Sequence, residues 1–322
     1  MISTIKHRTA PTQLLALKAL EQRLPLDHPK RANVEMDLMK QKARFAGERR
    51  VNYYLAFLPK VMHYRLFYDL RLKDKHDVQL DTLILTTNYI VLLETKHYTE
   101  YSEINELSQQ LHHKQNHTET IPQPLEQIYR KQIELGNIFA ANQLPPIPIY
   151  SYVLFTSPFN NIDLTQAPLD SEQMIRIDSL PKTIEQLNHK NDYCYLTNQD
   201  IKSLSRLLLE MHKPHSKSPL EIYSISRSDL IYGVFCPNCK YSTLKRNHYQ
   251  HHWKCLSCSY LGKEDHVKAL LDYALLFQKQ ITNSEARRFL NIQSRDQVYR
   301  ILLGVLGRPN GHRYSLKTLL HD

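Results

Sequence analysis

Two apolar runs separated by four residues constrain this chain more than any other feature. The runs cover residues 83–85 and 90–93, and the sequence between them is Thr-Thr-Asn-Tyr. Apolar segments of this length around a short polar turn predict two buried strands that pair as a hairpin. Three charged residues stand at the outer ends of these strands: Asp81 before the first run, and Glu94 and Lys96 after the second. Charges at the ends of buried strands need either solvent or a partner.

The predicted hairpin brings the two acids together. A tight turn between the runs pairs Leu85 with Ile90, and the same register places Asp81 opposite Glu94. Opposed side chains in an antiparallel pair have Cβ atoms about 4.5–5.5 Å apart, and like charges so placed destabilise the sheet. A divalent cation such as Mg²⁺ or Mn²⁺ would compensate, because carboxylates are its usual protein ligands. Lys96 lies on the same face as Glu94 and could stabilise charge on a phosphate or orient an attacking water. The alternative is a solvated ion pair between Glu94 and Lys96 at the end of an ordinary strand.

Four ordered motifs support the metal-site interpretation. They are GERRV at 47–51, VQLDTLIL at 78–85, IVLLETKHY at 90–98 and PLEQ at 124–127. Together they resemble the nuclease-related domain, NERD, of the PD-(D/E)XK nuclease superfamily, with a similarity that extends over residues 40–160. Tyr98 stands where the family more commonly has Trp, while the acids and the lysine are present. The resemblance implies a Mg²⁺-dependent phosphodiesterase core with a restriction-endonuclease-like fold.

The resemblance also implies roles for individual residues. Asp81, Glu94 and Lys96 carry the D…E-x-K pattern, in which the acids hold the metal. Glu48, on the helix before the hairpin, would support the metal shell. Gln127, on a helix after the core strands, would orient water or substrate.

The rest of the chain predicts an α/β protein with small C-terminal modules. Residues 11–58 predict two helices, and apolar strands and an amphipathic helix follow them. The polar segment 102–120 predicts a surface loop without strands. The expected domains are an N-terminal helical extension at 1–39, the nuclease-like domain at 40–212, a linker at 213–227, a zinc ribbon at 228–262 and a winged-helix-like domain at 263–322.

Four of the five cysteines form two C-x₂-C pairs that are separated by fifteen residues. Each pair supplies two thiolates from one tight turn, and four thiolates close a tetrahedral Zn²⁺ shell with no open position. Three histidines between the pairs could replace a thiolate, but four correctly spaced cysteines make that replacement unnecessary. The sequence therefore predicts a structural zinc site formed by Cys236, Cys239, Cys255 and Cys258.

The C-terminal segment predicts two short helices and a turn. Thr282-x-x-Glu285 and Ser294-x-x-Gln297 are capping boxes, and Asn310-Gly311 predicts a tight hairpin. Two such helices followed by a hairpin resemble a winged helix, whose second helix enters the major groove of DNA. The alternative is a small helical bundle that mediates protein contacts. The predicted DNA contacts are Arg295, Gln297, Tyr299 and Arg300 on the exposed face of the second helix and Arg313 on the wing.

Charge and composition favour a nucleic-acid partner. From Glu221 to the end the chain carries 15 Lys or Arg against 8 Asp or Glu, a net of +7, out of +10 for the whole chain. A basic segment of this kind indicates a polyanion, most simply DNA, with RNA as a second possibility. None of the seven glycines builds a phosphate-binding loop, which excludes P-loop ATPases and dinucleotide-binding dehydrogenases. We expect a cytoplasmic protein without a membrane partner, because the sequence shows neither a secretory signal nor a run of about 18 apolar residues.

The function predicted from these features is metal-dependent hydrolysis of DNA phosphodiester bonds, with the substrate positioned by the zinc ribbon and the winged helix. One alternative is a non-catalytic DNA-binding or regulatory protein that uses the NERD core as a platform. Another is an RNA-processing factor that uses the ribbon as a stacking surface.

Overall fold

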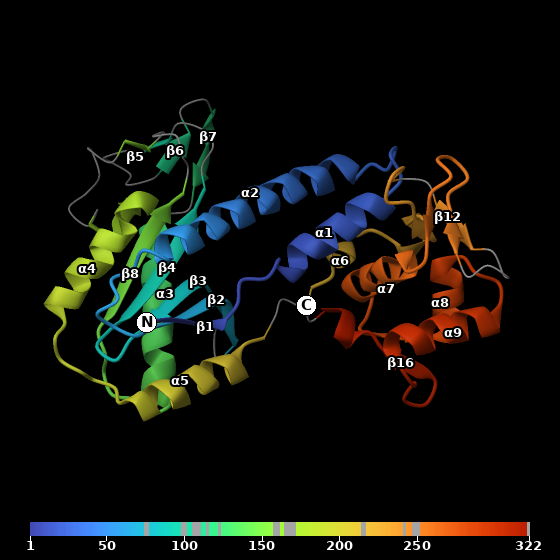
Figure 1. Ribbon diagram of the computed structural model, residues 1–322. Coiled ribbons are helices and arrows are strands. Elements are labelled where there is room, and N and C mark those ends of the chain that lie inside the picture. The colour runs from blue at the N-terminus through green and yellow to red at the C-terminus, as the bar shows by residue number, and fades with distance from the viewer. Residues whose placement is uncertain are drawn as a thin grey trace. The chain divides into compact units, whose positions relative to one another are not determined.

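The computed structural model of the chain describes residues 1–73, 77–97, 102–104, 111–113, 116–121, 124–156, 162–163, 172–213, 217–240, 243–246 and 252–320. The chain divides into two compact units. Unit 1 contains Met1–Arg8 and Lys42–Pro214, and unit 2 contains Thr9–Gln41 and His215–Asp322. Both units combine helices with strands (Figure 1), which confirms the predicted α/β class. None of the helices in the described ranges has the length and apolar character needed to cross a bilayer.

Unit 1 is built on a mixed six-stranded sheet with the order β1-β2-β3-β4-β8-β10. β3 is antiparallel to both of its neighbours, β2 and β4, while β1 is parallel to β2, and β4, β8 and β10 are parallel to one another. The two predicted apolar runs form β3 and β4, the two middle strands. The strands are Ile2–Lys6 (β1), Tyr64–Lys73 (β2), Asp77–Leu85 (β3), Ile90–Lys96 (β4), Ile149–Phe155 (β8) and Met174–Arg176 (β10).

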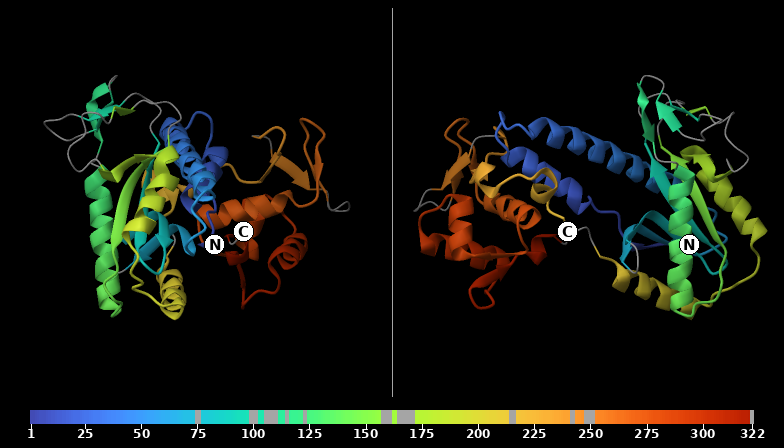
Figure 2. Two further views of the ribbon diagram at one scale, coloured as in Figure 1. Left: turned by 60° about the vertical axis from the view of Figure 1, so that its left-hand side comes forward. Right: turned by 180° about the vertical axis from the view of Figure 1, so that it is seen from behind.

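Helices cover both faces of this sheet (Figure 2). Helices α3 (Pro124–Ala141) and α5 (Asn198–Met211) pack on one face, together with Ile90 and Leu92 of β4. The C-terminal part of α2 (Arg31–Leu55) and helix α4 (Leu180–Lys190), which follows a short 3₁₀ turn, pack on the other face with the next residues of β4. Since successive strand residues point to opposite faces, an unbroken apolar run is what a strand covered on both sides requires.

Three of the four strands of a second, small sheet lie in the polar segment that was expected to be a loop. Its strand order is β7-β6-β5-β9. The expectation that this segment lacks strands is therefore wrong. Backbone pairing needs no apolar face, so hydrophobic periodicity gave no sign of these strands. They are Ser102–Ile104 (β5), Leu111–His113 (β6), Asn116–Ile121 (β7) and Ile162–Asp163 (β9).

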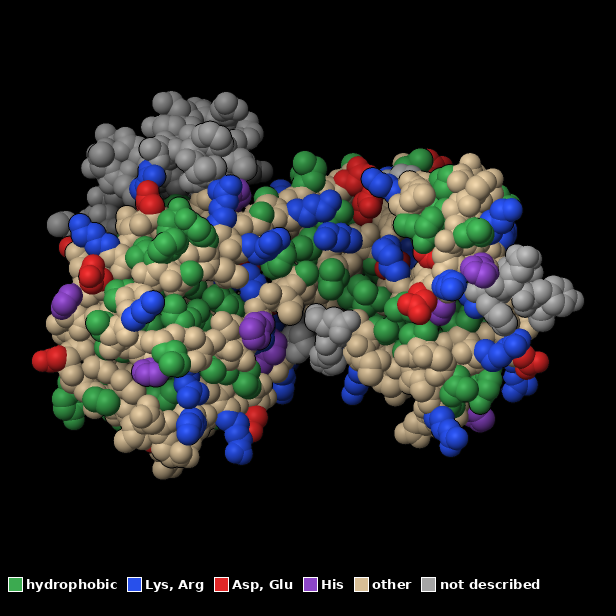
Figure 3. Space-filling view, viewed as in Figure 1, with side chains coloured by type: hydrophobic (Ala, Val, Ile, Leu, Met, Phe, Trp, Pro, Cys, Tyr) green, Lys and Arg blue, Asp and Glu red, His purple; other side chains and the backbone are tan. Residues whose placement is uncertain are grey.

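Unit 2 combines short strands and helices, and a hydrophobic cluster joins its strands to helices α7, α8 and α9. An antiparallel sheet of β11 to β14 carries the cysteines, and a separate pair, β15 and β16, flanks the last two helices. Figure 3 shows Lys, Arg and His side chains together on unit 2 near these strands and helices. The strands are Val234–Phe235 (β11), Thr243–Arg246 (β12), Trp253–Lys254 (β13), Leu261–Gly262 (β14), Gln280–Thr282 (β15) and Arg313–Ser315 (β16). The helices are α1 (Thr12–Arg23), the first part of α2, α6 (Pro219–Tyr223), α7 (Asp265–Leu276), α8 (Asn283–Leu290) and α9 (Arg295–Leu306), with 3₁₀ turns at Arg227–Asp229 and Lys317–Leu320.

A buried cluster of unit 2 is shared by the strands that flank the cysteines and by the C-terminal helices. Trp253 and Leu244 from the strands belong to the same buried cluster as Leu270 of α7, Phe289 of α8 and Leu302 of α9. The ribbon strands therefore depend on the helices for burial of their apolar side chains. A sheet of two- to four-residue strands could not bury enough surface by itself.

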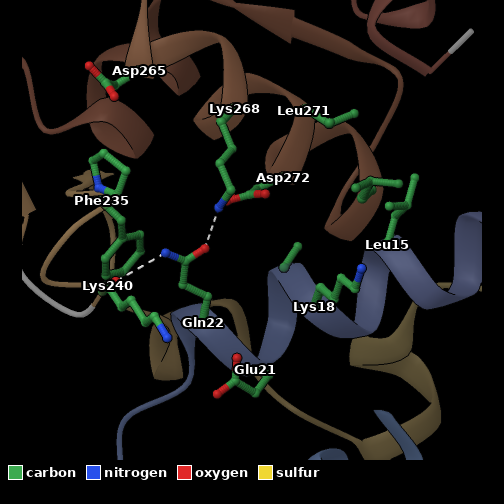
Figure 4. A pocket seen from close by; sticks show the side chains of 13 residues that line it. Leu15, Lys18, Glu21, Gln22, Phe235, Lys240, Asp265, Lys268, Leu271 and Asp272 are labelled. Atoms are coloured by element: carbon green, nitrogen blue, oxygen red, sulfur yellow. Dashed lines mark hydrogen bonds between the residues drawn. The ribbon is translucent and has the colours of Figure 1, made fainter. Parts of the chain in front are cut away.

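A buried ion pair fixes α1 within unit 2. Arg23 Nη2 lies 2.8 Å from Asp272 Oδ2 on α7, and the guanidinium carbon lies 4.3 Å from the ring centroid of Phe289. A cavity of about 470 Å³ adjoins this contact (Figure 4). Within it Lys268 donates to the Gln22 side chain, which in turn donates to a backbone carbonyl. These polar groups satisfy one another, so we regard the cavity as a packing junction.

Candidate functional site

The hairpin of β3 and β4 follows the predicted register over most of its length. Leu85 pairs with Ile90 and Thr82 pairs with Leu93. The ladder between the two strands ends at that pair. The predicted cross-strand pairing of Asp81 with Glu94 is therefore wrong, although both residues lie at the same end of the hairpin.

The pairing ends there because the alternation of side chains between the two faces of the sheet is interrupted in β3 at Asp81. Leu83 packs on the α3 face of the sheet, and so does Leu80, although an unbroken strand would place them on opposite faces. The neighbouring strand β2 is irregular at the same level: Asp69 has a φ of +47° and is skipped by the ladder between β2 and β3. Asp81 thereby leaves the cross-strand position, and its Oδ2 accepts a hydrogen bond of 3.0 Å from the backbone N–H of Thr95.

Arg44 joins Asp81 to Glu48. Its Nη2 lies 2.9 Å from Asp81 Oδ1, and its Nε donates to Glu48 Oε1 at 3.0 Å. Arg8, which follows β1, donates from Nη1 to the other Glu48 oxygen at 2.9 Å. Asp81 and Glu48 are both buried. The Arg44 guanidinium group therefore binds Glu48 of helix α2 and Asp81 of strand β3 at the same time.

The two acids differ in their protonation. Burial opposes ionisation of Asp81, but Arg44 and other nearby cations hold the pKa of Asp81 below its usual value. Burial and the negative charge of Asp81 raise the pKa of Glu48 to about 7, although two arginines contact it. Neighbouring acids whose pKa values are driven apart are characteristic of functional carboxylate pairs.

Glu94 and Lys96 stand at the end of β4 and meet helix α3. Lys96 Nζ donates to Glu94 Oε1 at 3.0 Å and to Gln127 Oε1 at 2.7 Å. Lys131, one turn beyond Gln127, forms an ion pair with the other Glu94 oxygen. Glu94 is only 6% exposed, so the alternative of a solvated Glu–Lys pair is wrong.

Gly47 allows α2 to approach the end of β4. A Cβ atom at this position would lie 2.7 Å from Thr156 Oγ1 and 2.9 Å from His97 Cβ, which is closer than carbon contacts allow. Glu48 follows directly on the same helix and contacts Arg44, which also binds Asp81. The glycine therefore permits the helix packing that delivers Glu48 to Asp81.

The structure brings the five predicted residues together from α2, β3, β4 and α3. Three further members were not predicted: Arg8, Arg44 and Lys131. Arg44 precedes Glu48 by four residues and Lys131 follows Gln127 by four, the spacing at which helical side chains meet, so this pattern could have revealed both. No local pattern connects Arg8 with the site. Tyr98 lies outside the described residues.

The four cysteines of unit 2 form a second cluster. Cys236 Sγ lies 3.6 Å from Cys258 Sγ, Cys239 Sγ lies 3.7 Å from Cys255 Sγ, and all four sulfur atoms lie within 4.8 Å of one another. A tetrahedral zinc ion with Zn–S bonds of about 2.3 Å has sulfur–sulfur edges of about 3.8 Å. The cysteines are free of disulfides. Four thiolates at these separations fit one structural zinc ion. Of the three histidines between the pairs, His252 is described and lies outside the cluster.

Helices α8 and α9 begin near the predicted capping residues, but only the first capping box is complete. Thr282 and Glu285 exchange both bonds. At α9, Ser294 Oγ accepts from the Gln297 N–H at 3.3 Å, while the Gln297 side chain returns no bond. The prediction that Gln297 is exposed is wrong: it is 7% exposed, because it lies one turn before the buried Ile301 on the same side of the helix. The other predicted contact residues are exposed: Arg295, Tyr299, Arg300 and Arg313.

The turn after α9 is displaced by one residue from its predicted position. Asn310 and Arg313 exchange backbone hydrogen bonds of 2.9 and 3.2 Å, so the central residues are Gly311 and His312. Gly311 has a φ of +62°, a value that favours glycine. Strand β16 then pairs with β15, which precedes α8.

Comparisons with known proteins agree with the first of these sites. The family model of the nuclease-related domain matches residues 43–156. This range contains the five predicted residues of the carboxylate site. No curated protein and no solved structure gives a significant match to the chain.

Proposed function

Because residues 43–156 of this chain form a nuclease-related domain, we propose that the protein hydrolyses DNA phosphodiester bonds with the help of a divalent metal ion. The observation that carries this proposal is the convergence of three carboxylates and a lysine at one end of the β3–β4 hairpin. Arg44 links Glu48 to Asp81, and Lys96 links Glu94 to Gln127. Acids and a lysine in this relation are the groups that phosphodiester hydrolysis needs.

Asp81 and Glu94 would hold Mg²⁺ or Mn²⁺, with Glu48 supporting them. Oxygen donors are the ligands that both ions prefer. When bound, such an ion supplies a Lewis acid for the phosphate oxygens. Arg44 and Lys131 contact the same carboxylates, so binding of the ion requires them to give up these oxygens.

Lys96 and Gln127 would act on the phosphate and the attacking water. The Lys96 ammonium is held between two acceptors from different elements, so its position is fixed before the substrate arrives. A fixed ammonium group stabilises negative charge that develops on the phosphate more strongly than a mobile one. The Gln127 side-chain oxygen orients the Lys96 ammonium group, and the Gln127 amide N–H groups remain available to water or substrate.

The C-terminal unit would position the DNA. The order α7, β15, α8, α9 and β16, with β15 paired to β16, supports the proposal of a winged helix, in which the exposed arginines of α9 and β16 would face the duplex. The zinc ribbon at 228–262 would be a structural part of this unit. Residues 40–212 would be the catalytic domain.

A second candidate is a non-catalytic DNA-binding platform. The observation that favours it is the closed ion-pair network, in which Asp81, Glu48 and Glu94 each bind an arginine or a lysine. Such a network can stabilise a fold with no metal at all.

Cleavage assays separate the two candidates. Linear duplex DNA, circular duplex DNA, single-stranded DNA and RNA are incubated with Mg²⁺, with Mn²⁺ or without added divalent ion; a chelator is omitted because it would also remove zinc. The Glu94→Ala variant is compared with Glu126→Ala, which removes an exposed glutamate from the first turn of α3. Metal-dependent cutting that is lost only in Glu94→Ala supports the nuclease. Equal DNA binding without cutting in all three proteins sinks it in favour of the platform, and cutting confined to RNA overturns the DNA assignment.

A further inference from the structure

A groove of about 810 Å³ lies in unit 2 between the ribbon strands and α9. Arg246 of β12, Lys263 before α7 and Arg300 of α9 line it, and Glu264 is the carboxylate among the described residues that do so. Three cations against one acid make the groove electropositive. Its position beside α9 places it next to the helix whose exposed residues we assign to DNA.

Three hydrogen-bond donors on residues that line this groove have no acceptor among the described residues. Gln297 is 7% exposed, and its Nε2 has no partner among the described residues. Arg246 Nε and Nη1 are buried and equally lack a partner within the described ranges. Buried polar groups without a partner are uncommon in folded proteins, and a cluster of unpaired donors indicates a missing acceptor.

The described surroundings of Arg246 hold this guanidinium group against an aromatic ring and include no ion-pair partner for it. Its central carbon lies 5.1 Å from the ring centroid of Trp253, whose Nε1 donates to His266 Nδ1 at 3.1 Å. Burial and the neighbouring Arg246 lower the pKa of His266 to about 4, so this imidazole is neutral. Burial and the positive charge of Arg300 lower the pKa of Arg246. An anion between the two arginines would relieve this repulsion.

We propose that this groove binds a backbone phosphate of the DNA strand that lies against α9. A phosphodiester oxygen can accept from the Gln297 amide and from two guanidinium groups at once, and arginine is well suited to such paired contacts. The choice of DNA rests on the proposed function. The groove adds that Arg246 and Gln297 position the backbone, whereas the sequence predicted Gln297 only as a DNA contact on the exposed face of the helix.

The test measures DNA binding without cleavage. The full-length, zinc-loaded protein is titrated with a labelled DNA duplex at several salt concentrations, with no added Mg²⁺. Arg300→Ala and Gln297→Leu are compared with Lys317→Ala, which removes an exposed positive charge of the same unit outside the groove. Gln297→Leu keeps the volume and removes the unpaired donor. Melting temperatures of the variants show whether the unit still folds.

We expect Arg300→Ala to weaken binding about tenfold and to reduce the salt slope by about one, because one phosphate contact is lost. Gln297→Leu should weaken binding about three- to tenfold while its melting temperature stays at or above that of the wild type. Lys317→Ala should bind within about twofold of the wild type. Inorganic phosphate should compete with DNA in the wild type and less in the two groove variants.

Wild-type DNA affinity in both groove variants would overturn the inference. So would loss of phosphate binding in these variants with unchanged DNA affinity, because the groove would then serve a free phosphate. The outcome is independent of the nuclease proposal: binding that depends on the groove can coexist with absent cleavage, and cleavage can coexist with binding that ignores the groove.

Discussion

Lys96 and Gln127 meet at 2.7 Å where the end of β4 reaches helix α3. Glutamine carries no charge, so it directs the ammonium group without neutralising it. Lys131, from the same helix, instead neutralises Glu94. Lys96 and Lys131 therefore contact the same Glu94 carboxylate, but only Lys96 is also held by Gln127. Their replacement should have different consequences.

Replacement of Lys96 should cost far more activity than replacement of Lys131. If the nuclease proposal holds, Lys96→Met lowers kcat on the order of 100-fold or more, because a fixed charge near the phosphate is lost. Lys131→Met should lower it less than about tenfold, because the metal ion takes over the neutralisation of Glu94. Single-turnover cleavage of duplex DNA measures both variants. Equal losses would show that the two lysines have one common role.

Arg44 should compete with the divalent ion for Asp81 and Glu48. Arg44→Ala should lower the free energy of unfolding without metal by about 1–2 kcal/mol, since two buried carboxylates lose a shared donor. Mg²⁺ should then raise the melting temperature of this variant more than that of the wild type. Thermal melting with and without Mg²⁺ checks this, with Arg49→Ala, an exposed neighbour on α2, as the reference. A Mg²⁺ response equal to the wild type would contradict competition at these oxygens.

The raised pKa of Glu48 makes stability depend on pH. Its pKa is about 7 in the folded protein and 4.5 in an ordinary environment, so between these values the folded state holds a proton that the unfolded chain releases. The contribution is fully present below pH 4.5 and is lost as the pH rises through 7. Glu48→Gln removes it, and the stability of this variant relative to the wild type should grow by about 3 kcal/mol between pH 4.5 and 8. Calorimetric melting across this range measures the difference. A difference that is flat with pH, like that of Glu126→Gln, would show that Glu48 is already ionised at pH 5.

Loss of zinc should expose Trp253. This residue is the single tryptophan of the chain, is 1% exposed and shares its cluster with Cys236 and Cys255. Cys255→Ser should lower the bound zinc from one ion per chain and shift the tryptophan emission to longer wavelength, because the ribbon strands lose their cross-link. Elemental analysis and fluorescence report the two effects. Cys194→Ser, which removes an exposed thiol outside the cluster, should retain the zinc and the emission of the wild type.

Local patterns in the sequence determined much of the fold and of both sites. The apolar runs at 83–85 and 90–93 predicted the two middle strands and their register, because burial on both faces requires continuous apolar residues. The C-x₂-C pairs predicted the cysteine cluster, because each pair already places two sulfur atoms together. The helices at 11–58 and the capping box at Thr282 were equally local and were confirmed. The segment at 102–120 had no such pattern, and its strands were not foreseen.

Only the tertiary structure decided how the charges are partnered. Arg8 reaches Glu48 and Arg44 reaches Asp81 across elements that are far apart in the chain, and no spacing in the sequence encodes such contacts. The interrupted alternation at Asp81 lies beside the irregular residue Asp69 of β2, and the observed ladder between β3 and β4 ends one pair before the predicted pair of Asp81 and Glu94. The sequence predicted that Gln297 is exposed, but its side chain is buried and lines the groove beside α9. Periodicity reports which side of an element is apolar, whereas the partner of a buried polar group is set by which elements pack together.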